Sequence, residues 1–135
     1  MRKYMTDLLE PEYIGKKGIV ATPHLGASTA EAEENCAVMA TDQLMDYLEN
    51  GNIVNSVNFP RVSMERSGDE RHCFLVKNDK TADEVKAKME EHYGDKLKGF
   101  AGAKNRANEF GYFICDVAAG AEPFSCDCVI RTRVL

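Results

Sequence analysis

The segment TPHLGAST, residues 22–29, contains the side chain best suited to acid–base chemistry in this sequence. His24 lies between Pro23 and Gly26 and follows the short apolar run 19–21, which predicts a loop histidine at the end of a strand. An imidazole with its ordinary pKa of about 6.5 exchanges protons near neutral pH, so it can act as a general acid or base. A turn histidine can also have no chemical role, and the segment alone leaves both interpretations open.

The remaining histidines and the cysteines indicate structure more than chemistry. His72 begins a predicted strand and His92 lies near the end of a predicted helix, where the helix dipole favours a cation. Five cysteines, an odd number spread mostly through apolar segments, favour reduced and buried thiols over a disulfide framework. Cys126 and Cys128 are one residue closer than a CxxC pair, and no second pair at zinc spacing accompanies them. We therefore predict no metal site.

The composition predicts a folded chain that binds neither nucleic acid nor membranes. The 135 residues are 44% hydrophobic, and the formal net charge is −5, whereas nucleic-acid binding draws on clustered Lys and Arg. The sequence contains no apolar run of the roughly 18–20 residues that a membrane helix needs, and residues 1–13 lack the pattern of a secretory signal. We therefore expect a cytoplasmic protein with a small-molecule or protein partner.

The elements that must position His24 come from the first part of the chain. A buried strand is predicted over 19–21, and the capping-box pattern from Ser28 to Glu31 predicts the start of a helix. Apolar residues then recur every three or four positions as far as Leu48, and Asn50-Gly51 ends the helix. Residues 53–54 and 57–59 are predicted to be extended.

The second part of the chain has a different pattern. Polar residues 61–70 predict a linker, and strands are predicted over 71–77, 97–105, 110–117 and the last eight residues. A capping box from Thr81 to Glu84 begins a helix that Gly94 ends, and residues 120–126 allow a short helix or a loop. The last strand is predicted to place Cys128, Ile130, Thr132 and Val134 on one face.

This order, β-α-β-β-(short α)-β, predicts the split βαβ arrangement of ferredoxin-like domains. The expected fold class is α/β in the broad sense, more narrowly α+β. Three segments follow: residues 1–60 as one unit, 61–70 as a linker and 71–135 as a small domain. Residues 1–60 form too little surface to fold alone, so we expect them to belong to a larger α/β body or to need a partner chain.

Residues 19–60, IVATPHLGASTAEAEENCAVMATDQLMDYLENGNIVNSVNFP, resemble the end of the Rossmann-type catalytic body in the D-2-hydroxyacid dehydrogenase family. Residues 71–135 resemble the regulatory ACT domain that many of these enzymes carry, through Asn105, the strand 111–117 and the ending VIRTRVL. The resemblance implies that His24 is the acid/base on a substrate hydroxyl while hydride passes to NAD. It also implies that Gly26 and Ala27 line the cofactor.

The family places a carboxylate and an arginine before this histidine. Arg2, Glu10 and Glu12 are present in residues 1–23, but their surroundings differ from the family's motifs. The sequence also contains no GxG, so the GxGxxG loop that grips a dinucleotide is missing. We therefore expect a fragment that neither catalyses nor binds NAD alone.

The resemblance to an ACT domain implies a small amino-acid effector such as L-serine, with Asn78 and Asn105 as the candidate effector-binding residues. The Pro-Gly pair that often follows the first of these is replaced by Asp79-Lys80, so a purely structural dimerisation module is an equal alternative. The apolar face of helix 28–50 would be exposed in an isolated chain, which predicts a homo-oligomer. A non-catalytic binding module, or a dehydrogenase for another hydroxy acid, are the competing functions.

Overall fold

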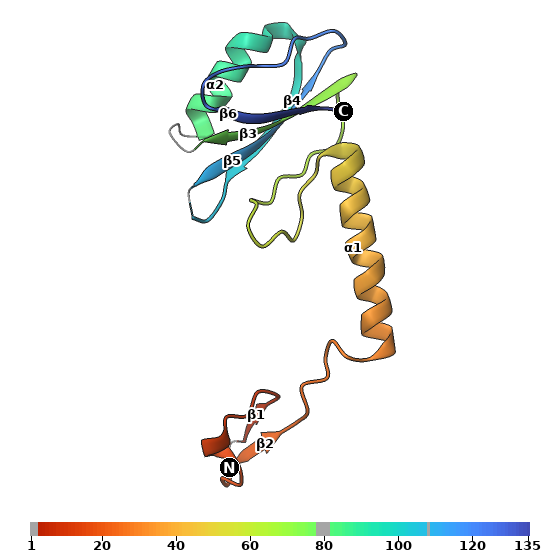
Figure 1. Cartoon of the computed structure of the whole chain (residues 1–135), viewed down its shortest axis with the longest axis vertical. Coiled ribbons are helices and arrows are strands. Elements are labelled where there is room, and N and C mark those ends of the chain that lie inside the picture. The colour runs from red at the N-terminus through yellow and green to blue at the C-terminus, as the bar shows by residue number, and fades with distance from the viewer. Residues whose placement is uncertain (1–2, 78–81, 108) are drawn as a thin grey trace. The chain divides into compact units, whose positions relative to one another are not determined.

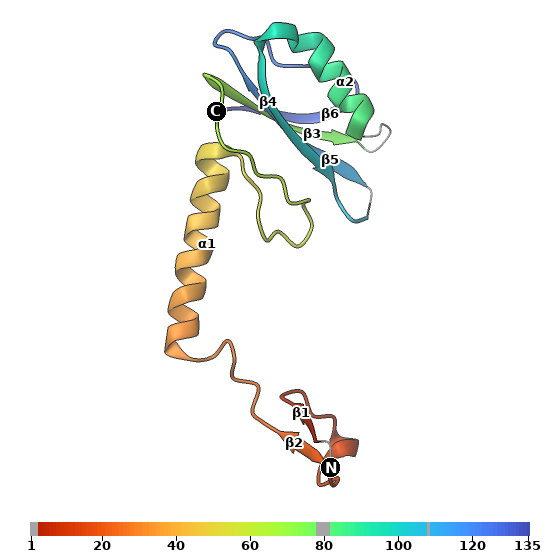
Figure 2. The ribbon, with the colours of Figure 1, turned by 180° about the vertical axis from the view of Figure 1, so that it is seen from behind.

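The computed structural model describes residues 3–77, 82–107 and 109–135 (Figure 1; Figure 2 from behind). The elements are β1 (Tyr4–Thr6), η1 (Pro11–Tyr13), β2 (Ile19–Ala21), α1 (Ala30–Asn50), β3 (Glu70–Lys77), α2 (Ala82–Tyr93), η2 (Gly94–Lys96), β4 (Leu97–Lys104), β5 (Phe110–Val117) and β6 (Val129–Val134). The chain therefore mixes helices and strands, as predicted. It divides into two compact units, Met1–Ala40 and Thr41–Leu135, which are described separately.

The first unit contains a small parallel pair of strands. β2 spans the predicted residues 19–21, and β1, which the sequence analysis did not predict, pairs with it in the register Tyr4↔Ile19 to Thr6↔Ala21. Their carboxyl ends therefore meet at one edge.

Helix α1 begins one residue later than the capping-box pattern predicted. The hydroxyl of Thr29 accepts the Ala32 N–H at 3.1 Å, so Thr29, and not Ser28, is the N-cap. The predicted end at Asn50 is confirmed, because Gly51 adopts φ 70° and donates its N–H to Tyr47 at 3.0 Å. The helix has no buried residue, and its predicted apolar face is exposed.

The second unit is built on a four-stranded antiparallel sheet in the order β4-β5-β3-β6. Helix α2 covers one face in both views (Figures 1 and 2). The predicted inner face of this helix is confirmed at Val85, Met89 and Tyr93, which are buried in a core with Phe74 and Phe113. The Thr81 end of the predicted capping box lies outside the described residues.

The opposite face of the sheet is covered by the segment that follows α1. Ile53 and Val62 form an isolated antiparallel bridge and are buried against Tyr112 and Ile114. Residues 61–70, expected as a linker, therefore include side chains that pack on the sheet. Of residues 53–54, which were predicted to be extended, only Ile53 pairs like a strand residue, through this single bridge.

At the end of the chain one open choice is decided and two predictions need correction. Residues 118–128 form a loop without a helix, since Gly120 takes a left-handed φ of 71° and Pro123 has no N–H to donate. Ile130, Thr132 and Val134 are exposed, because no helix covers the edge strand β6; of the predicted face only Cys128 is buried. Cys126 and Cys128, expected as thiols, form a disulfide.

Candidate functional site

The first candidate site lies where β1 and β2 end. Asp7 comes directly after β1 and His24 comes three residues after β2, so the parallel pairing brings both to the same edge. The imidazole Nδ1 of His24 lies 2.9 Å from a carboxylate oxygen of Asp7. The two side chains are 63% and 51% exposed, so the pair is open to solvent.

Local backbone hydrogen bonds hold the two residues in place. Thr22 donates its N–H to the Thr6 carbonyl at 3.0 Å, which continues the strand pairing up to the residues flanking Asp7 and His24. The Thr6 hydroxyl accepts the Leu8 N–H at 3.1 Å and so forms a turn around Asp7. After His24, Ser28 donates its N–H to Leu25 at 3.0 Å, which closes the turn that leads into α1.

This geometry suits proton transfer. A carboxylate next to Nδ1 favours the tautomer with the proton on that nitrogen, which leaves Nε2 to exchange a proton with a substrate. In water the pair gains little stability, because exposed ion pairs contribute roughly 0–1 kcal/mol. The pair therefore adds little to the stability of the fold, and its geometry is one that a proton-transfer site could use.

Asp7 is the residue that the sequence analysis missed. Of the other candidates named from the sequence, Glu10 lies directly before η1, Glu12 lies in it, and Arg2 lies outside the described residues. A polar residue directly after a strand is a pattern that could have indicated Asp7. However, β1 is only three residues long and was not recognised as a strand.

The other predicted site residues lie in different places. Gly26 and Ala27 follow His24 and are exposed, and nothing lies within 4 Å of the position that a Cβ on Gly26 would take. Asn78 lies outside the described residues. Asn105 belongs to the second unit, where its side-chain oxygen accepts the N–H groups of Glu109 at 2.8 Å and Phe110 at 3.3 Å in the β4–β5 turn. The structure thus brings Asp7 to His24, while Asn105 serves a separate turn.

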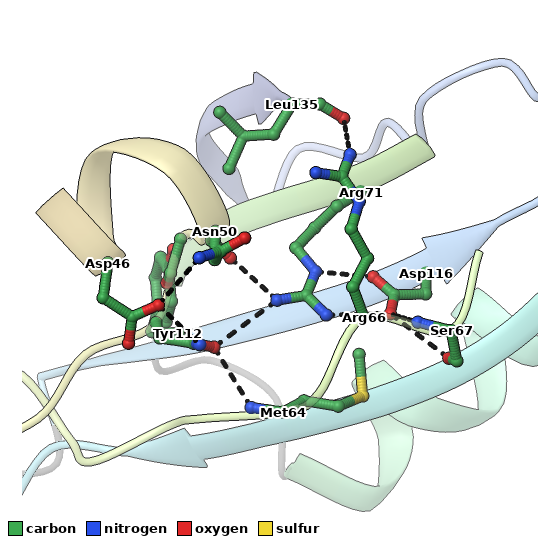
Figure 3. A network of polar contacts seen from close by, with 11 residues as sticks. Asp46, Asn50, Met64, Arg66, Ser67, Arg71, Tyr112, Asp116 and Leu135 are labelled. Carbon is green, nitrogen blue, oxygen red and sulfur yellow. Dashed lines mark hydrogen bonds and ion pairs between the residues drawn. The ribbon is translucent and has the colours of Figure 1, made fainter. Parts of the chain in front are cut away.

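A second polar cluster lies within the second unit, at the end of α1 (Figure 3). The guanidinium of Arg71 donates to both carboxylate oxygens of Asp116, at 2.6 and 2.8 Å, and both side chains are fully buried. Ser67 donates its N–H to the same carboxylate at 2.7 Å. Burial acts to raise the pKa of Asp116, but the hydrogen bonds from Arg71 and Ser67 outweigh it and lower that pKa.

The same guanidinium connects the sheet to the helix end. Arg71 donates to the Asn50 carbonyl at 2.9 Å, so it caps one of the carbonyls that α1 leaves unpaired. The Asp46 carboxylate accepts the side-chain amides of Asn50 at 2.9 Å and Asn52 at 3.0 Å. Hydrogen bonds therefore link the last turn of α1 to β3. This link was not predicted from the sequence. The available signal was a charged residue near one end of each strand, Arg71 in β3 and Asp116 in β5.

Comparison with known proteins identifies relatives of this chain, although no family model matches it. It is 41% identical over 61 residues to D-3-phosphoglycerate dehydrogenase of Haemophilus influenzae and 38% identical over 60 residues to that of Escherichia coli K12. These relatives are D-3-phosphoglycerate dehydrogenases. A putative D-3-phosphoglycerate dehydrogenase of Schizosaccharomyces pombe is 44% identical over 48 residues.

The predicted resemblance to these dehydrogenases is thus confirmed for part of the chain. The matches to the two bacterial enzymes cover 44% of this chain and 15% of each enzyme, and the match to the yeast protein covers 36% and 10%. The chain therefore matches only a small part of the length of the curated relatives, whose names describe oxidoreductases. In the described part of the chain no helix is long and apolar enough to cross a membrane.

Proposed function

We propose that this chain is the C-terminal portion of an NAD-dependent D-3-phosphoglycerate dehydrogenase, which oxidises 3-phosphoglycerate to 3-phosphohydroxypyruvate on the route to L-serine. The observation that carries the proposal is the 2.9 Å pair of His24 and Asp7 at the end of two parallel strands. The similarity to D-3-phosphoglycerate dehydrogenases supports it independently.

The chain's own residues would perform the proton step. His24 Nε2 takes the proton of the substrate hydroxyl as the carbonyl forms, and Asp7 at Nδ1 orients the ring and stabilises the imidazolium. Bound NAD would accept the hydride in the complete enzyme. Gly26 and Ala27 leave open space beside His24 where the cofactor could lie. The sequence contains no GxGxxG loop for the pyrophosphate, so we assign this chain the proton step alone.

Residues 71–135 serve, in this proposal, as an ACT-type domain for regulation and assembly. The observed strand order places β5 between β3 and β4, with α2 connecting those two strands, which is the split βαβ arrangement. L-serine is the proposed effector, with Asn78 and Asn105 as its candidate ligands, and a homo-oligomer is the proposed assembly. A non-catalytic assembly module is the second candidate, favoured by the exposed apolar side chains of α1 and β6.

A chimera tests the catalytic proposal. Residues 1–60 of this chain, which include Asp7, Glu12 and His24, replace the end of the catalytic body of the Escherichia coli enzyme, and turnover of 3-phosphoglycerate with NAD is measured. We expect an active chimera in which His24→Gln lowers kcat by about 10²–10⁴-fold. His92→Gln in the isolated chain controls for loss of folding caused by replacing a histidine.

Two results would contradict the proposal. One is a folded chimera that binds NAD but does not turn over; the other is full activity of the His24→Gln chimera. The isolated chain is expected to leave NADH fluorescence unchanged. A rise in its melting temperature with L-serine would support the ACT-type role, and no rise would favour the assembly module.

A further inference from the structure

A pocket of about 350 Å³ lies on the sheet face opposite α2, and all the residues that line it belong to the second unit. This volume is within the range of roughly 300–1,000 Å³ that is typical of small-molecule sites. Neither His24 nor Asn105 is among the described residues that line this pocket, so a ligand site here does not depend on the proposed function.

The floor of the pocket is apolar. Leu75 lines it and is paired across the strands with Tyr112 on one side and Arg131 on the other, so these three side chains project to the same face. Phe59 stands edge-on to the Tyr112 ring, with 6.2 Å between the ring centroids, and forms one wall. Tyr47, from the last turns of α1, also lines the pocket.

One edge of the pocket is basic. Arg131 and Arg133 are two residues apart on β6, and none of the described lining residues is acidic, although the whole chain has a net charge of −5. The guanidinium of Arg133 already has partners within the protein. It donates to the carbonyls of Tyr47 at 3.0 Å and of Leu48, and it lies 5.1 Å from the centre of the Tyr47 ring.

Arg131 differs from its neighbour. It is exposed at the rim and forms no ion pair with any residue in the described ranges. A single available guanidinium presents a planar fork that matches one carboxylate, whereas a dianion would require further cations. The apolar floor in turn requires a ligand with an apolar body.

We propose that this pocket binds a small amphipathic monocarboxylate, with its carboxylate on Arg131 and its apolar body on Leu75 between Phe59 and Tyr47. Because Tyr47 and Leu48 belong to the last turns of α1, such a ligand would bridge β6 and the end of this helix. The site is thus a second ligand site that does not include Asn105, the described candidate for an amino-acid effector.

The test uses the full chain with 4-phenylbutyrate as the probe, followed by calorimetric titration and by ¹H–¹⁵N NMR. We expect saturable binding with shifted amide signals at Leu75, Tyr112 and Arg131. The neutral analogue 4-phenylbutyramide should bind about tenfold more weakly, and Arg131→Gln should weaken the acid by about tenfold, the usual effect of losing a charged hydrogen-bond partner.

Arg61→Gln is the matched control, since Arg61 is exposed and does not line this pocket. It should leave the affinity within about twofold, the size of effect expected for a solvent-screened charge outside the pocket. Equal binding of the acid and the amide, an unchanged affinity of Arg131→Gln with a wild-type melting curve, or no saturable binding would each overturn the proposal. Binding that appears only when the chain dissociates into monomers would instead assign the pocket to an interface between copies.

Discussion

A carboxylate bound to Nδ1 of an imidazole fixes the tautomer and stabilises the charged ring, and both effects help proton transfer at Nε2. Asp7 and His24 have this geometry, but their side chains are half-exposed or more, so water competes with the pair. Under the proposed function, proton transfer by this pair therefore depends on what covers it in the complete enzyme.

We predict that Asp7→Asn lowers kcat of the active chimera by about 10- to 100-fold. This is less than the roughly 10⁴-fold loss typical of a buried catalytic carboxylate, because Asp7 is open to solvent. The measurement is steady-state turnover, with Glu12→Gln as the matched control. An Asp7→Asn chimera as active as its parent would remove Asp7 from the site.

The buried pair of Arg71 and Asp116 should be essential for stability. Asp116→Asn leaves the Arg71 guanidinium buried without its counter-charge, which we expect to lower the free energy of unfolding by about 3–5 kcal/mol. Urea unfolding of the full chain measures this loss. Asp42→Asn, on an exposed position of α1, should change stability by less than about 0.5 kcal/mol; equal effects of the two substitutions would contradict the prediction.

His72 should make the stability of the second unit depend on pH. Burial lowers the pKa of His72, while Glu70, whose carboxylate oxygen lies 3.5 Å from Nε2, partly opposes this, and nearby His92 adds to the lowering. Nδ1 of His72 also lies 2.8 Å from the hydroxyl of Tyr93, which accepts the Phe124 N–H.

Because the folded-state pKa of His72 is below its unfolded value, the unfolded chain binds the proton more tightly. The stabilisation is complete above about pH 6.5 and is lost as the pH falls from there towards the folded pKa. Urea unfolding between pH 7.5 and pH 5 should show this decline, and His72→Gln should flatten it. A decline of equal slope in the variant would assign the effect to other groups.

At the scale of the elements, α1 is a helix of 21 residues without a buried side chain, so its ends contribute much of its stability. Its first turn depends on the Thr29 cap, and its last turn on Arg71 and Gly51. The two ends are thus held by different means: a local hydroxyl at one and a residue of the sheet at the other.

We predict that Thr29→Ala frays the start of α1 at a cost of about 1 kcal/mol, because the Ala32 N–H loses its acceptor. Hydrogen exchange of the amides in residues 31–34 measures the fraying. Ser28→Ala is the control and should leave these rates unchanged. If Ser28→Ala accelerated exchange more than Thr29→Ala, the cap would lie where the capping-box pattern placed it.

At the scale of the whole molecule, exposed apolar side chains on α1 favour association between copies. Leu44 is 57% exposed, on the apolar face that the sequence predicted for this helix. We predict that Leu44→Glu weakens self-association of the chain in sedimentation velocity. Asn35→Glu adds the same charge to another exposed side of the helix and should not weaken it. A chain that is monomeric at all concentrations would contradict the prediction.

The sequence by itself determined most of the elements and singled out one residue as a candidate for chemistry. Hydrophobic periodicity predicted α1, α2 and the sheet strands to within a few residues, because these patterns repeat over local segments. His24 could be singled out for the same reason, since its strand, its loop and the following helix are contiguous in the chain.

Only the tertiary structure decided which distant residues meet. Asp7 reaches His24 through the register of two parallel strands, and Arg71 reaches Asp116 through the register of β3 and β5. Ile130 and Val134 are exposed because residues 118–128 form a loop and not a helix that could cover β6. Strand pairing and the covering of a sheet face depend on contacts between segments far apart in the chain. A local pattern of residues carries no information about such contacts.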